Sequence, residues 1–479
     1  MMKNNSLPSP LISLIPICFL VAMLAVAIYL FGSDALAGGS QICLLTATAF
    51  CVLIGMVGFK RKWKEYEEAI CLNIGGIGTA LIILLLIGAL SGAWMICGVV
   101  PTLIYYGIQI IDPNFFLVST CLICAIVSVM TGSSWTTIAT IGIALLGIGK
   151  ALGFEEGWIA GAIISGAYFG DKISPLSDTT VLAASTTETP LFTHIKYLML
   201  TTIPSLIITL LIFLLAGLSH ESSSGIHVAE YAQALSSKFD ISLWLLVVPF
   251  LTGCMIFKRL PSLVTLFLSA ILGVIFAVIF QPNLLREIAG MEDGTLSLVK
   301  GGMSVLFGST SLDTGNAEVN ELIATRGMSG MLDTIWLIIC AMCFGGAMTA
   351  GGMIESITSF FMRFTKKCVN LVSSTVASGL FMNLTTADQY ISIILTGNMF
   401  KEVYKSCGYE SRLLGRTIED AVTVTSPLIP WNSCGMTQST VLGVSTFTYL
   451  PYCFFNYISP LMSIIVSAIG YKIYRRTMK

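Results

Sequence analysis

Long runs of apolar residues alternate with short polar segments along most of the chain. Many of these runs hold about 20 residues, the length that an α-helix needs to cross the hydrocarbon core of a bilayer. Because the runs contain few charged side chains, they predict membrane-spanning helices rather than the amphipathic helices of a soluble core. Full spans are expected near residues 10–31, 40–59, 70–91, 196–217, 241–257, 262–281, 333–353 and 450–473.

The overall composition agrees with this pattern. Of the 479 residues, 55% are hydrophobic and only 11% are charged, against about 25% charged residues in an average soluble protein. We therefore expect an all-α polytopic membrane protein. The net charge of −1 gives no electrostatic attraction for nucleic acid, so no nucleic-acid partner is expected.

Cysteines raise the question of a metal site, because Cys121/Cys124 and Cys340/Cys343 have C-x-x-C spacing. Both pairs lie in uncharged apolar runs, so we interpret them as small buried residues of helices. No cofactor is expected. The apolar run at 11–31 is longer than the roughly 7–15 residues of a signal-peptide core, and we interpret it as the first membrane helix.

The distribution of lysine and arginine predicts which segments face the cytoplasm. The basic segments are 60–64, 258–259, 363–367, 401–416 and 471–479. The polar or acidic segments, which are expected outside, are 33–39, 218–240 and 283–325. The protein is therefore expected in the cell's inner (plasma) membrane, with both termini in the cytoplasm.

The region 115–150 departs from the pattern of full spans. Its two apolar arms, 115–130 and 135–150, have about 16 residues each and would be about 24 Å long as helices, which is short for a core of about 30 Å. They are separated by the polar sequence TGSSW, and both flanks resemble external segments. A re-entrant hairpin fits these facts, and two short full helices remain the alternative.

Parts of the first half of the chain recur in the second half. The spacing is 252 residues for two pairs and 254 for a third: 174–176 (SPL) with 426–428 (SPL), Met130 with Met382, and 92–93 (GA) with 346–347 (GA). A nearly constant spacing between separate motifs indicates an internal repeat.

The flanks of the two copies carry opposite charge signs, which predicts that the copies have opposite orientations in the membrane. We expect a first half at 1–217, an external linker at 218–240 and a second half at 241–479. Each half would contain five crossings and one re-entrant hairpin, and an odd number of crossings inverts the second half. Inverted-topology repeats are typical of secondary transporters.

Each half is also expected to contain a broken helix. The hairpins are placed at about 115–150 and 369–405, and the broken helices at about 156–190 and 410–441. In the first broken helix, the sequence GDKISPLSD should end the helix at residue 169 and allow a new helix from 177, because proline disfavours helix in the residue before it. In the second, Pro427 and Pro430 have the same effect. Unwound backbone within a membrane is tolerated only where it is buried in protein or lines a watery cavity.

The polar residues of the two tips and the two breaks are candidate ligands for an ion. From the first half they are Ser133, Ser134, Asp171, Lys172, Ser174, Ser177, Asp178 and Thr179, and from the second Asn383, Thr385, Asp388, Gln389, Ser426 and Asn432. Nearly all are oxygen donors, which suit a hard cation such as Na⁺. We expect Na⁺ at Asp178 and Asp388, and proton coupling at Asp178, Asp388 and Asp420.

Several of these residues have a second interpretation. Lys172 either forms a salt bridge with Asp171 or Asp178 or contacts the substrate directly. The hydroxyl groups either bind an ion or only satisfy the interrupted backbone.

Residues near the predicted cytoplasmic ends are also ambiguous. Glu419 and Asp420 are either functional or solvated, and His194 and Lys196 are interpreted as residues of the membrane interface. A carboxylate within a membrane is costly unless it is paired or hydrated, so each one suggests a functional site.

The sequences GAYFGDKISPLSDTT, TTADQYISI, EDAVTVTSPLIPWNSCG and FGGAM are similar to those of the NhaC-type Na⁺/H⁺ antiporter family, within the Ion Transporter superfamily. The resemblance covers roughly residues 60–440. It implies sodium extrusion driven by proton entry, in a hairpin-and-broken-helix fold that moves as an elevator and is usually a homodimer. Some relatives instead couple malate uptake to lactate, sodium and protons. Val181 stands where this family commonly has asparagine, which leaves the substrate open.

Two functions therefore compete. In Na⁺/H⁺ exchange, a proton and a cation compete for one carboxylate in a partly dry site, because Na⁺ favours the ionised form and burial the protonated form. In a sodium- and proton-coupled exchanger of organic acids, Lys172 and the N-termini of half-helices would bind the anion. The motifs of metalloproteases, α/β-hydrolases and nucleotide-binding enzymes do not occur in the sequence, so we do not expect an enzyme.

Overall fold

A computed structural model describes residues 7–31, 38–219, 225–258, 260–291, 294–361 and 367–475. Within these ranges the chain is predominantly helical, and its only strand-like pairings are the isolated bridges Thr310–Thr325 and Tyr409–Arg475. Most of the segments 33–39 and 363–367, whose membrane side the sequence predicts, lie outside the described residues. So do parts of 218–240, 258–259, 283–325 and 471–479.

The first part of the chain forms thirteen elements, in which η2 is a 3₁₀ turn and η3 a π-helical turn. They are α1 (Pro10–Phe31), α2 (Gly39–Phe59), α3 (Trp63–Gly76), α4 (Gly78–Ile96), α5 (Val99–Ile110), η2 (Pro113–Phe115), α6 (Phe116–Thr131), α7 (Ser134–Thr137), η3 (Ile138–Gly142), α8 (Ile143–Ala151), α9 (Glu156–Ile173), α10 (Asp178–Thr186) and α11 (Leu191–Leu218).

The remaining elements follow the same style, with η7 a π-helical turn and η4, η5, η8 and η9 3₁₀ turns. They are α12 (Gly225–Lys238), η4 (Leu243–Leu246), α13 (Val247–Phe257), α14 (Ser262–Phe280), α15 (Pro282–Ala289), α16 (Thr295–Phe307), α17 (Ala317–Ile323), η5 (Met328–Met331), α18 (Leu332–Ala350), α19 (Met353–Phe361), α20 (Cys368–Thr386), α21 (Gln389–Ser406), α22 (Ser411–Ile418), η7 (Glu419–Thr423), η8 (Ser426–Leu428), α23 (Ser433–Leu442), α24 (Thr446–Tyr449), η9 (Leu450–Tyr452) and α25 (Phe454–Ile469).

Nine helices within the described residues are long and apolar enough to cross a membrane. Two further pairs qualify if each counts as one bent span: Ala229–Lys238 with Leu243–Phe257, bent by 86°, and Thr446–Tyr452 with Phe454–Ile469, bent by 53°. Large apolar side chains such as Phe267 of α14 remain exposed on their outer faces. An apolar surface of this extent is unfavourable in water and matches lipid tails. The prediction of an all-α polytopic membrane protein is confirmed.

The predicted spans agree with the helices in most places, and the span at 70–91 is the main error. Helix α3 ends at Gly76, and α4 starts at Gly78 and continues to Ile96. Two adjacent glycines, Gly75 and Gly76, favour a break because glycine loses more backbone entropy in a helix than any other residue. A hydropathy pattern does not register this break, since glycine is compatible with an apolar run.

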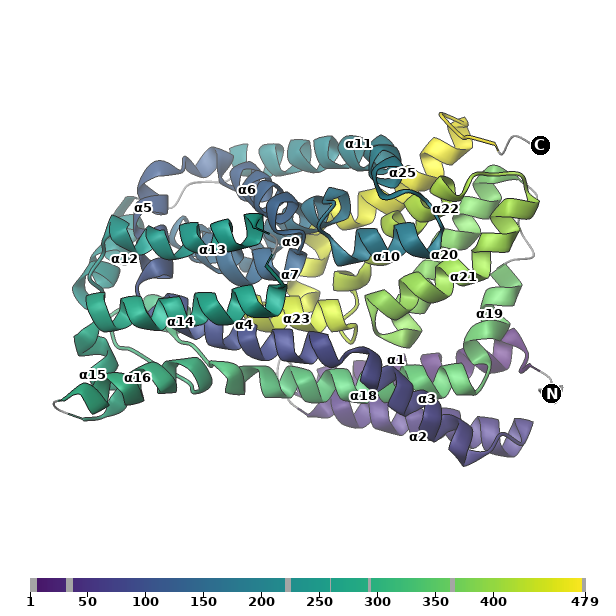
Figure 1. The fold of residues 1–479 in the computed structure, drawn as a ribbon, viewed down its shortest axis with the longest axis horizontal. Helices are drawn as coiled ribbons and strands as arrows, with labels where there is room; N and C mark the ends of the chain where they lie inside the picture. Colours follow the sequence, from purple (N-terminus) through teal and green to yellow (C-terminus); the bar gives the residue numbers. More distant parts are fainter. Residues whose placement is uncertain are drawn as a thin grey trace.

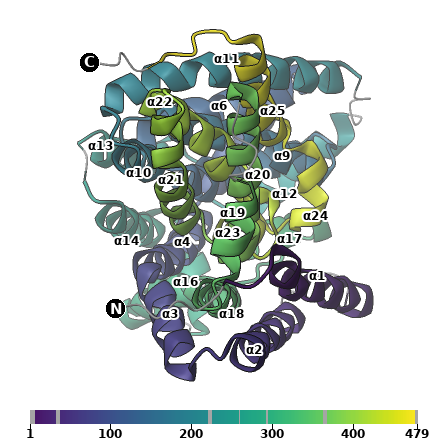
Figure 2. The same ribbon diagram turned by 90° about the vertical axis from the view of Figure 1, so that its right-hand side faces the viewer.

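The arrangement of the helices brings the two polar regions to the middle of the molecule. Figure 1 shows α20, α21, α22 and the end of α25 at the end of the molecule that also holds the C-terminus, with α5, α12 and α15 at the opposite end and α7 between them. Figure 2 shows α1, α2 and α3 on the side of the molecule away from α22 and the upper part of α25. The buried apolar residues form two cores, and the smaller one joins α10, α11, α20, α21 and α22.

Helices α4 and α18 occupy corresponding positions in the chain, because both of their ends are separated by 254 residues. Each is followed by a glycine in the left-handed region, Gly98 with φ 91° and Gly352 with φ 67°. A new helix, α5 or α19, begins directly after this glycine. The spacing is the one that relates the two Gly-Ala pairs in the sequence.

Helices α6 and α9 pack with their backbones almost in contact. A Cβ atom added at Gly166 of α9 would lie 2.1 Å from the carbonyl oxygen of Cys121, and one added at Gly170 would lie 2.4 Å from that of Ala125. These glycines therefore permit the close approach that holds α9 against α6.

We expect Gly166→Ala to lower the stability of the protein by about 1–3 kcal/mol, because the new methyl group forces the two helices apart. The measurement is the thermal unfolding of the purified protein in detergent. Gly253→Ala in α13 is the matched control, since a Cβ atom there would have no described atom within 4 Å. Equal unfolding temperatures for the two variants would show that the α6–α9 contact is not tight.

Candidate functional site

The first interruption of a helix lies between α9 and α10. Helix α9 continues through Asp171 and Lys172 to Ile173, and Ser177 caps α10 by accepting a hydrogen bond from the Thr180 backbone N–H at 3.4 Å. The prediction that this helix ends at residue 169 is therefore wrong by four residues. Proline restricts only the residue directly before it, so the turn that carries Asp171 and Lys172 stays helical.

The second interruption lies between α22 and α23. Helix α22 passes into the π-helical turn η7, and the 3₁₀ turn η8 follows. Asn432 then caps α23 by accepting from the Cys434 backbone N–H at 3.0 Å. Pro427 and Pro430 lie in this segment, and each removes a backbone donor that a continuous helix would need.

The tips between α6 and α7 and between α20 and α21 have the same backbone conformation. Gly132 (φ 67°) and Ala387 (φ 57°) are left-handed, and the residues that follow them, Ser133 and Asp388, cap the next helix. A left-handed alanine is uncommon. Its position indicates that both tips need the same tight turn.

Hydrogen bonds around the two tips recur at a spacing of 255 residues. The pairs are Ser128 Oγ to Ala167 O with Asn383 Nδ2 to Val422 O, Thr131 Oγ1 and Thr137 Oγ1 with Thr386 Oγ1 and Ser392 Oγ, Thr137 Oγ1 to Ser133 O with Ser392 Oγ to Asp388 O, and Ser134–Asp171 with Gln389–Ser426. The two tips therefore share their internal contacts as well as their backbone conformation.

This spacing corrects the one taken from the sequence. A spacing of 252 residues, based on the two Ser-Pro-Leu sequences, pairs Pro175 with Pro427. In the structure Pro175 corresponds to Pro430, because each stands two residues before a cap, Ser177 or Asn432. The second Ser-Pro-Leu sequence forms the η8 turn before the break, so its letters match without matching in position.

Asp171 is the centre of the first group of predicted ligands. Its Oδ2 atom accepts from the Ser134 backbone N–H at 3.1 Å and from Ser134 Oγ at 2.7 Å, and its Oδ1 atom accepts from Ser177 Oγ at 2.6 Å. Ser177 Oγ is in turn 2.9 Å from Thr179 Oγ1. All four side chains are buried. We call these four residues the Asp171 cluster. Its carboxylate lies between two helix N-termini, where a negative charge is favoured.

Asp388 holds the corresponding place in the second half, with a different use of its oxygens. Its Oδ1 atom accepts from the backbone N–H groups of Tyr390 and Ile391 at 2.9 and 3.0 Å, and its Oδ2 atom accepts from Ser433 Oγ at 2.9 Å. Two of these three bonds belong to the cap of its own helix. The geometry of Asp388 is therefore explained by local structure as well as by ion binding.

The other predicted ligands of the second half lie around Asp388 and are buried. Ser426 Oγ is 3.3 Å from Gln389 Oε1, and Asn432 Nδ2 is 3.2 Å from the carbonyl oxygen of Asn383. The hydroxyl of Thr385 donates to a carbonyl one turn earlier in its helix at 2.9 Å. Tip and break are thus bonded to each other in this half too.

The remaining ligands predicted in the first half have simpler surroundings. Ser133 Oγ accepts from the Thr136 backbone N–H at 3.2 Å, and Ser174 Oγ donates to the carbonyl oxygen of Val129 at 2.8 Å. Asp178 begins α10 and is exposed. Ser133 and Ser174 therefore satisfy interrupted backbone, the second of the two roles that the sequence left open for hydroxyl groups.

Lys172 forms an ion pair with Asp420, and both side chains are completely buried. Lys172 Nζ also donates to Ser459 Oγ at 2.8 Å, and Asp420 Oδ1 accepts from Thr201 and Ser459 at 3.0 Å each. The expectation that Lys172 pairs with Asp171 or Asp178 is wrong. The lysine side chain spans from α9 to η7, so its partner comes from the other half of the chain.

Three residues that the sequence placed near the cytoplasmic surface are in fact buried. Arg416, which belongs to the basic segment 401–416, is fully buried, as are Glu419 and His194. The interpretation of Glu419 and Asp420 as solvated, and of His194 as an interface residue, is wrong. One signal was available in the sequence, because Arg416 and Asp420 are four residues apart and such pairs meet on a helix. Their closest atoms, Nε and Oδ2, are 3.9 Å apart.

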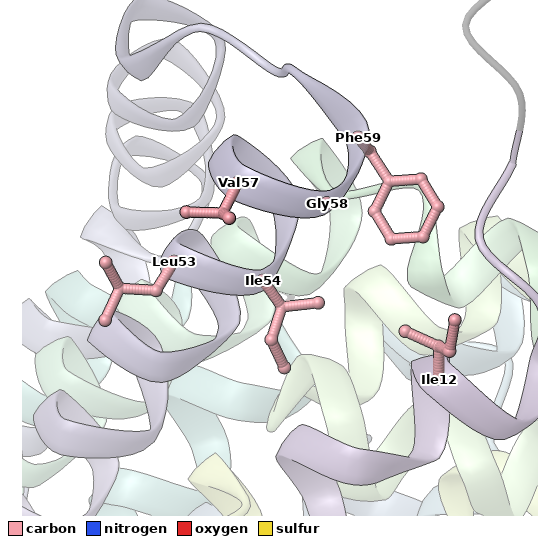
Figure 3. A pocket seen from close by; sticks show the side chains of 6 residues that line it. All are labelled: Ile12, Leu53, Ile54, Val57, Gly58 and Phe59. Carbon is pink, nitrogen blue, oxygen red and sulfur yellow. The ribbon is translucent and has the colours of Figure 1, made fainter.

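A surface depression between α1 and α2 is unrelated to this chemistry. Figure 3 shows its lining, which consists of Ile12, Leu53, Ile54, Val57, Gly58 and Phe59. These side chains are apolar and cannot bind an ion.

The fold and the buried ionisable groups between interrupted helices define an integral membrane protein of the secondary-transporter class. Residues 166–471 match the model of the Na⁺/H⁺ antiporter family. The chain belongs to this family.

Three characterised relatives show how varied its transport is. The chain is 37% identical to the Na⁺/H⁺ antiporter NhaC of Alkalihalophilus pseudofirmus, over 90% of this chain and 89% of the relative. It is 34% identical to the malate-2H⁺/Na⁺-lactate antiporter of Bacillus subtilis, over 90% of this chain and 89% of the relative. It is 32% identical to the arginine/ornithine antiporter ArcD of Halobacterium salinarum, over 97% and 93%. All three are antiporters, so the class is a transporter and not an enzyme.

Proposed function

We propose that this protein exchanges cytoplasmic Na⁺ for external protons. The observation that carries the proposal is the Asp171 cluster, in which one buried carboxylate is surrounded by hydroxyl oxygens of Ser134, Ser177 and Thr179. Oxygen ligands suit a hard cation, and a single carboxylate supplies the single negative charge that Na⁺ needs. The relatives named as Na⁺/H⁺ antiporters support the same cation.

The coupling in this proposal is a competition for the Asp171 carboxylate. A proton or a Na⁺ ion binds there, but not both, so each passage of one ion in one direction requires the passage of the other in return. The hydroxyl groups that donate to the carboxylate also carry lone pairs, which they turn toward Na⁺ when it binds. Asp178 lies at the exposed edge of this cluster, Asp388 holds the corresponding place in the second half, and Asp420 remains a further proton-coupling candidate.

Alternating access in this proposal follows from two inverted halves, 1–217 and 241–479, joined by an external linker at 218–240. The recurrence of hydrogen bonds at a spacing of 255 residues supports a repeat. The opposite charge signs of the flanks support the inversion.

The moving part in this proposal consists of the hairpins 115–150 and 369–405 and the broken helices 156–190 and 410–441. They cross the membrane together as an elevator, in a homodimer whose termini are cytoplasmic. The smaller core, which joins α10 with α20, α21 and α22, supports a shared movement of these elements.

A second candidate is a sodium- and proton-coupled exchange of small organic acids. The observation that favours it is the convergence of helix N-termini at Ser134, Asp178, Gln389 and Ser433, each of which presents backbone N–H groups suited to an anion. The malate/lactate relative supports this candidate. Lys172 is paired with Asp420, which weakens its predicted role in binding the anion.

Transport by the purified protein in proteoliposomes distinguishes the two candidates. An imposed proton gradient should dissipate when Na⁺ alone is added, followed with a pH-sensitive dye. Li⁺ and K⁺ are then tested in the same vesicles, and vesicles without protein are the control. A response that requires malate or lactate in addition would support the second candidate. A gradient that neither Na⁺ nor these acids dissipate would contradict both.

A further inference from the structure

A second group of buried polar side chains lies apart from the Asp171 cluster, where α11 packs against α22 and η7. Nine of its side-chain atoms have no hydrogen-bond partner among the described residues. They are Arg416 Nε, Nη1 and Nη2, Glu419 Oε1 and Oε2, Asp420 Oδ2, His194 Nδ1 and Nε2, and Thr423 Oγ1. No other part of the described chain concentrates so many unpartnered atoms on neighbouring residues.

The number of these atoms indicates what fills the space around them. Each buried polar group that is left without a partner is costly, and nine of them together exceed the usual margin of protein stability. Buried water molecules are the ordinary partners of such groups, because one water makes about three hydrogen bonds. We therefore interpret this group as the wall of a hydrated interior passage.

The groups are arranged in a line from the surface inward. Arg412, near the start of α22, is 26% exposed, whereas Arg416 and Asp420 are completely buried. Residues four apart in a helix lie on one face and differ in depth by about 6 Å. On the opposite side, Tyr197 of α11 lies under the Arg416 guanidinium at 4.9 Å, and His194 packs against the backbone of α22.

Glu419 differs from its neighbours in how its charge is balanced. Lys172 is matched by Asp420, with Thr201 of α11 and Ser459 of α25 bonded to the same carboxylate. Glu419 makes no ion pair with any described residue. A buried carboxyl group without a bound cation can take up a proton in place of a charge. One buried cation, Arg416, is left to balance it when the proton departs.

We propose that Glu419 carries the transported proton along this passage and is separate from the cation site at Asp171. The inference rests on the proposed Na⁺/H⁺ exchange and identifies the route of one of its two ions. The proton leaves Glu419 to water and travels past Arg416 and His194 toward the start of α22. Na⁺ binding at Asp171 adds a positive charge next to Lys172, which favours the loss of a proton from a nearby acid.

The test compares two fluxes of Glu419→Gln in proteoliposomes. Exchange of ²²Na⁺ for unlabelled Na⁺ needs only the cation site and should stay within about twofold of the parent. Na⁺-driven proton movement should fall by about 100-fold, the usual effect of removing a positioned proton-transfer group. Glu419→Asp, which keeps a carboxyl group, should restore part of the proton movement. Glu67→Gln is the control, because Glu67 is an exposed acid of α3.

Two results would overturn the inference. Normal proton coupling in Glu419→Gln would show that Glu419 carries no proton. Equal loss of both fluxes in a folded Glu419→Gln would place Glu419 in the cation site. A parent protein that exchanges only organic acids would instead remove the proposed function, and it is recognised before any variant is made.

A measurement on the unaltered protein covers the case in which Glu419→Gln does not fold. A hydrophobic carbodiimide reacts with protonated carboxyl groups in apolar surroundings, and mass spectrometry locates the adduct. We expect the adduct on Glu419 in Na⁺-free buffer and several-fold less of it when Na⁺ is present. Absence of the adduct from Glu419 under both conditions, with Asp171 labelled, would contradict the inference.

The passage itself is tested by His194→Leu, which replaces two partners of the water by apolar atoms. Na⁺-driven proton movement should slow, while ²²Na⁺ exchange stays unchanged. Equal proton rates in the variant and the parent would show that the route does not pass His194.

Discussion

Asp171→Asn should abolish Na⁺/H⁺ exchange, with a residual rate about 100-fold below that of the parent or lower. Asparagine has nearly the same shape as aspartate and keeps one oxygen for the Ser134 donors, so the helices around it should remain in place. It removes the charge for which Na⁺ and the proton compete. The measurements are Na⁺-dependent dissipation of a proton gradient and binding of ²²Na⁺ by the purified protein.

Asp178→Asn and Asp388→Asn complete this experiment. The sequence predicts that both are as damaging as a change at the ion site, because it expects Na⁺ at these two carboxylates. In the structure Asp178 is exposed and Asp388 caps its own helix, so we expect both variants to retain more exchange than Asp171→Asn. Full exchange in Asp171→Asn, with loss in either of the others, would move the cation site away from Asp171.

Asp420→Ala should have the largest effect on stability. It leaves the ammonium group of Lys172 buried without its carboxylate, together with the hydroxyl groups of Thr201 and Ser459. Removing one partner of a buried ion pair costs about 3–5 kcal/mol. We expect low yields of folded protein and a marked drop in the unfolding temperature in detergent.

The double variant Lys172→Met/Asp420→Leu separates this stability effect from transport. Apolar residues of similar size often replace a buried ion pair at little cost, so the unfolding temperature should recover most of the loss. Coupled transport should not recover, because the site no longer carries these charges. A single variant as stable as the parent would mean that Lys172 finds another acceptor and that the pair does not hold α9 to η7.

The membrane class and most of the helices could be predicted from the sequence. Apolar runs of about 20 residues have one stable arrangement in a bilayer, since every backbone donor must be satisfied within the segment. The limits of α1, α2, α14 and α18 therefore follow from composition alone. The error at 70–91 arose because Gly75 and Gly76 break a helix without interrupting its apolar character.

The polar residues of the site could also be identified, although their spacing and partners could not. Ser133 and Asp388 were found because polar tips are conspicuous between apolar arms. The correspondence of Pro175 with Pro430 was missed, because a three-letter match at 426–428 had the stronger resemblance. Backbone conformation, with Gly132 and Ala387 both left-handed, decides the true alignment.

The partner of Lys172 is the clearest case of what only the tertiary structure decides. In the sequence the nearest acids are Asp171 and Asp178, and local proximity favours them. Asp420 is 248 residues away and becomes the partner only because α9 and η7 pack together. The burial of Arg416, Glu419 and His194 has the same origin. Sequence hydropathy determined which segments enter the membrane, whereas the packing of one helix against another determined which charges meet and which lose contact with water, since ion pairing depends on distances in space.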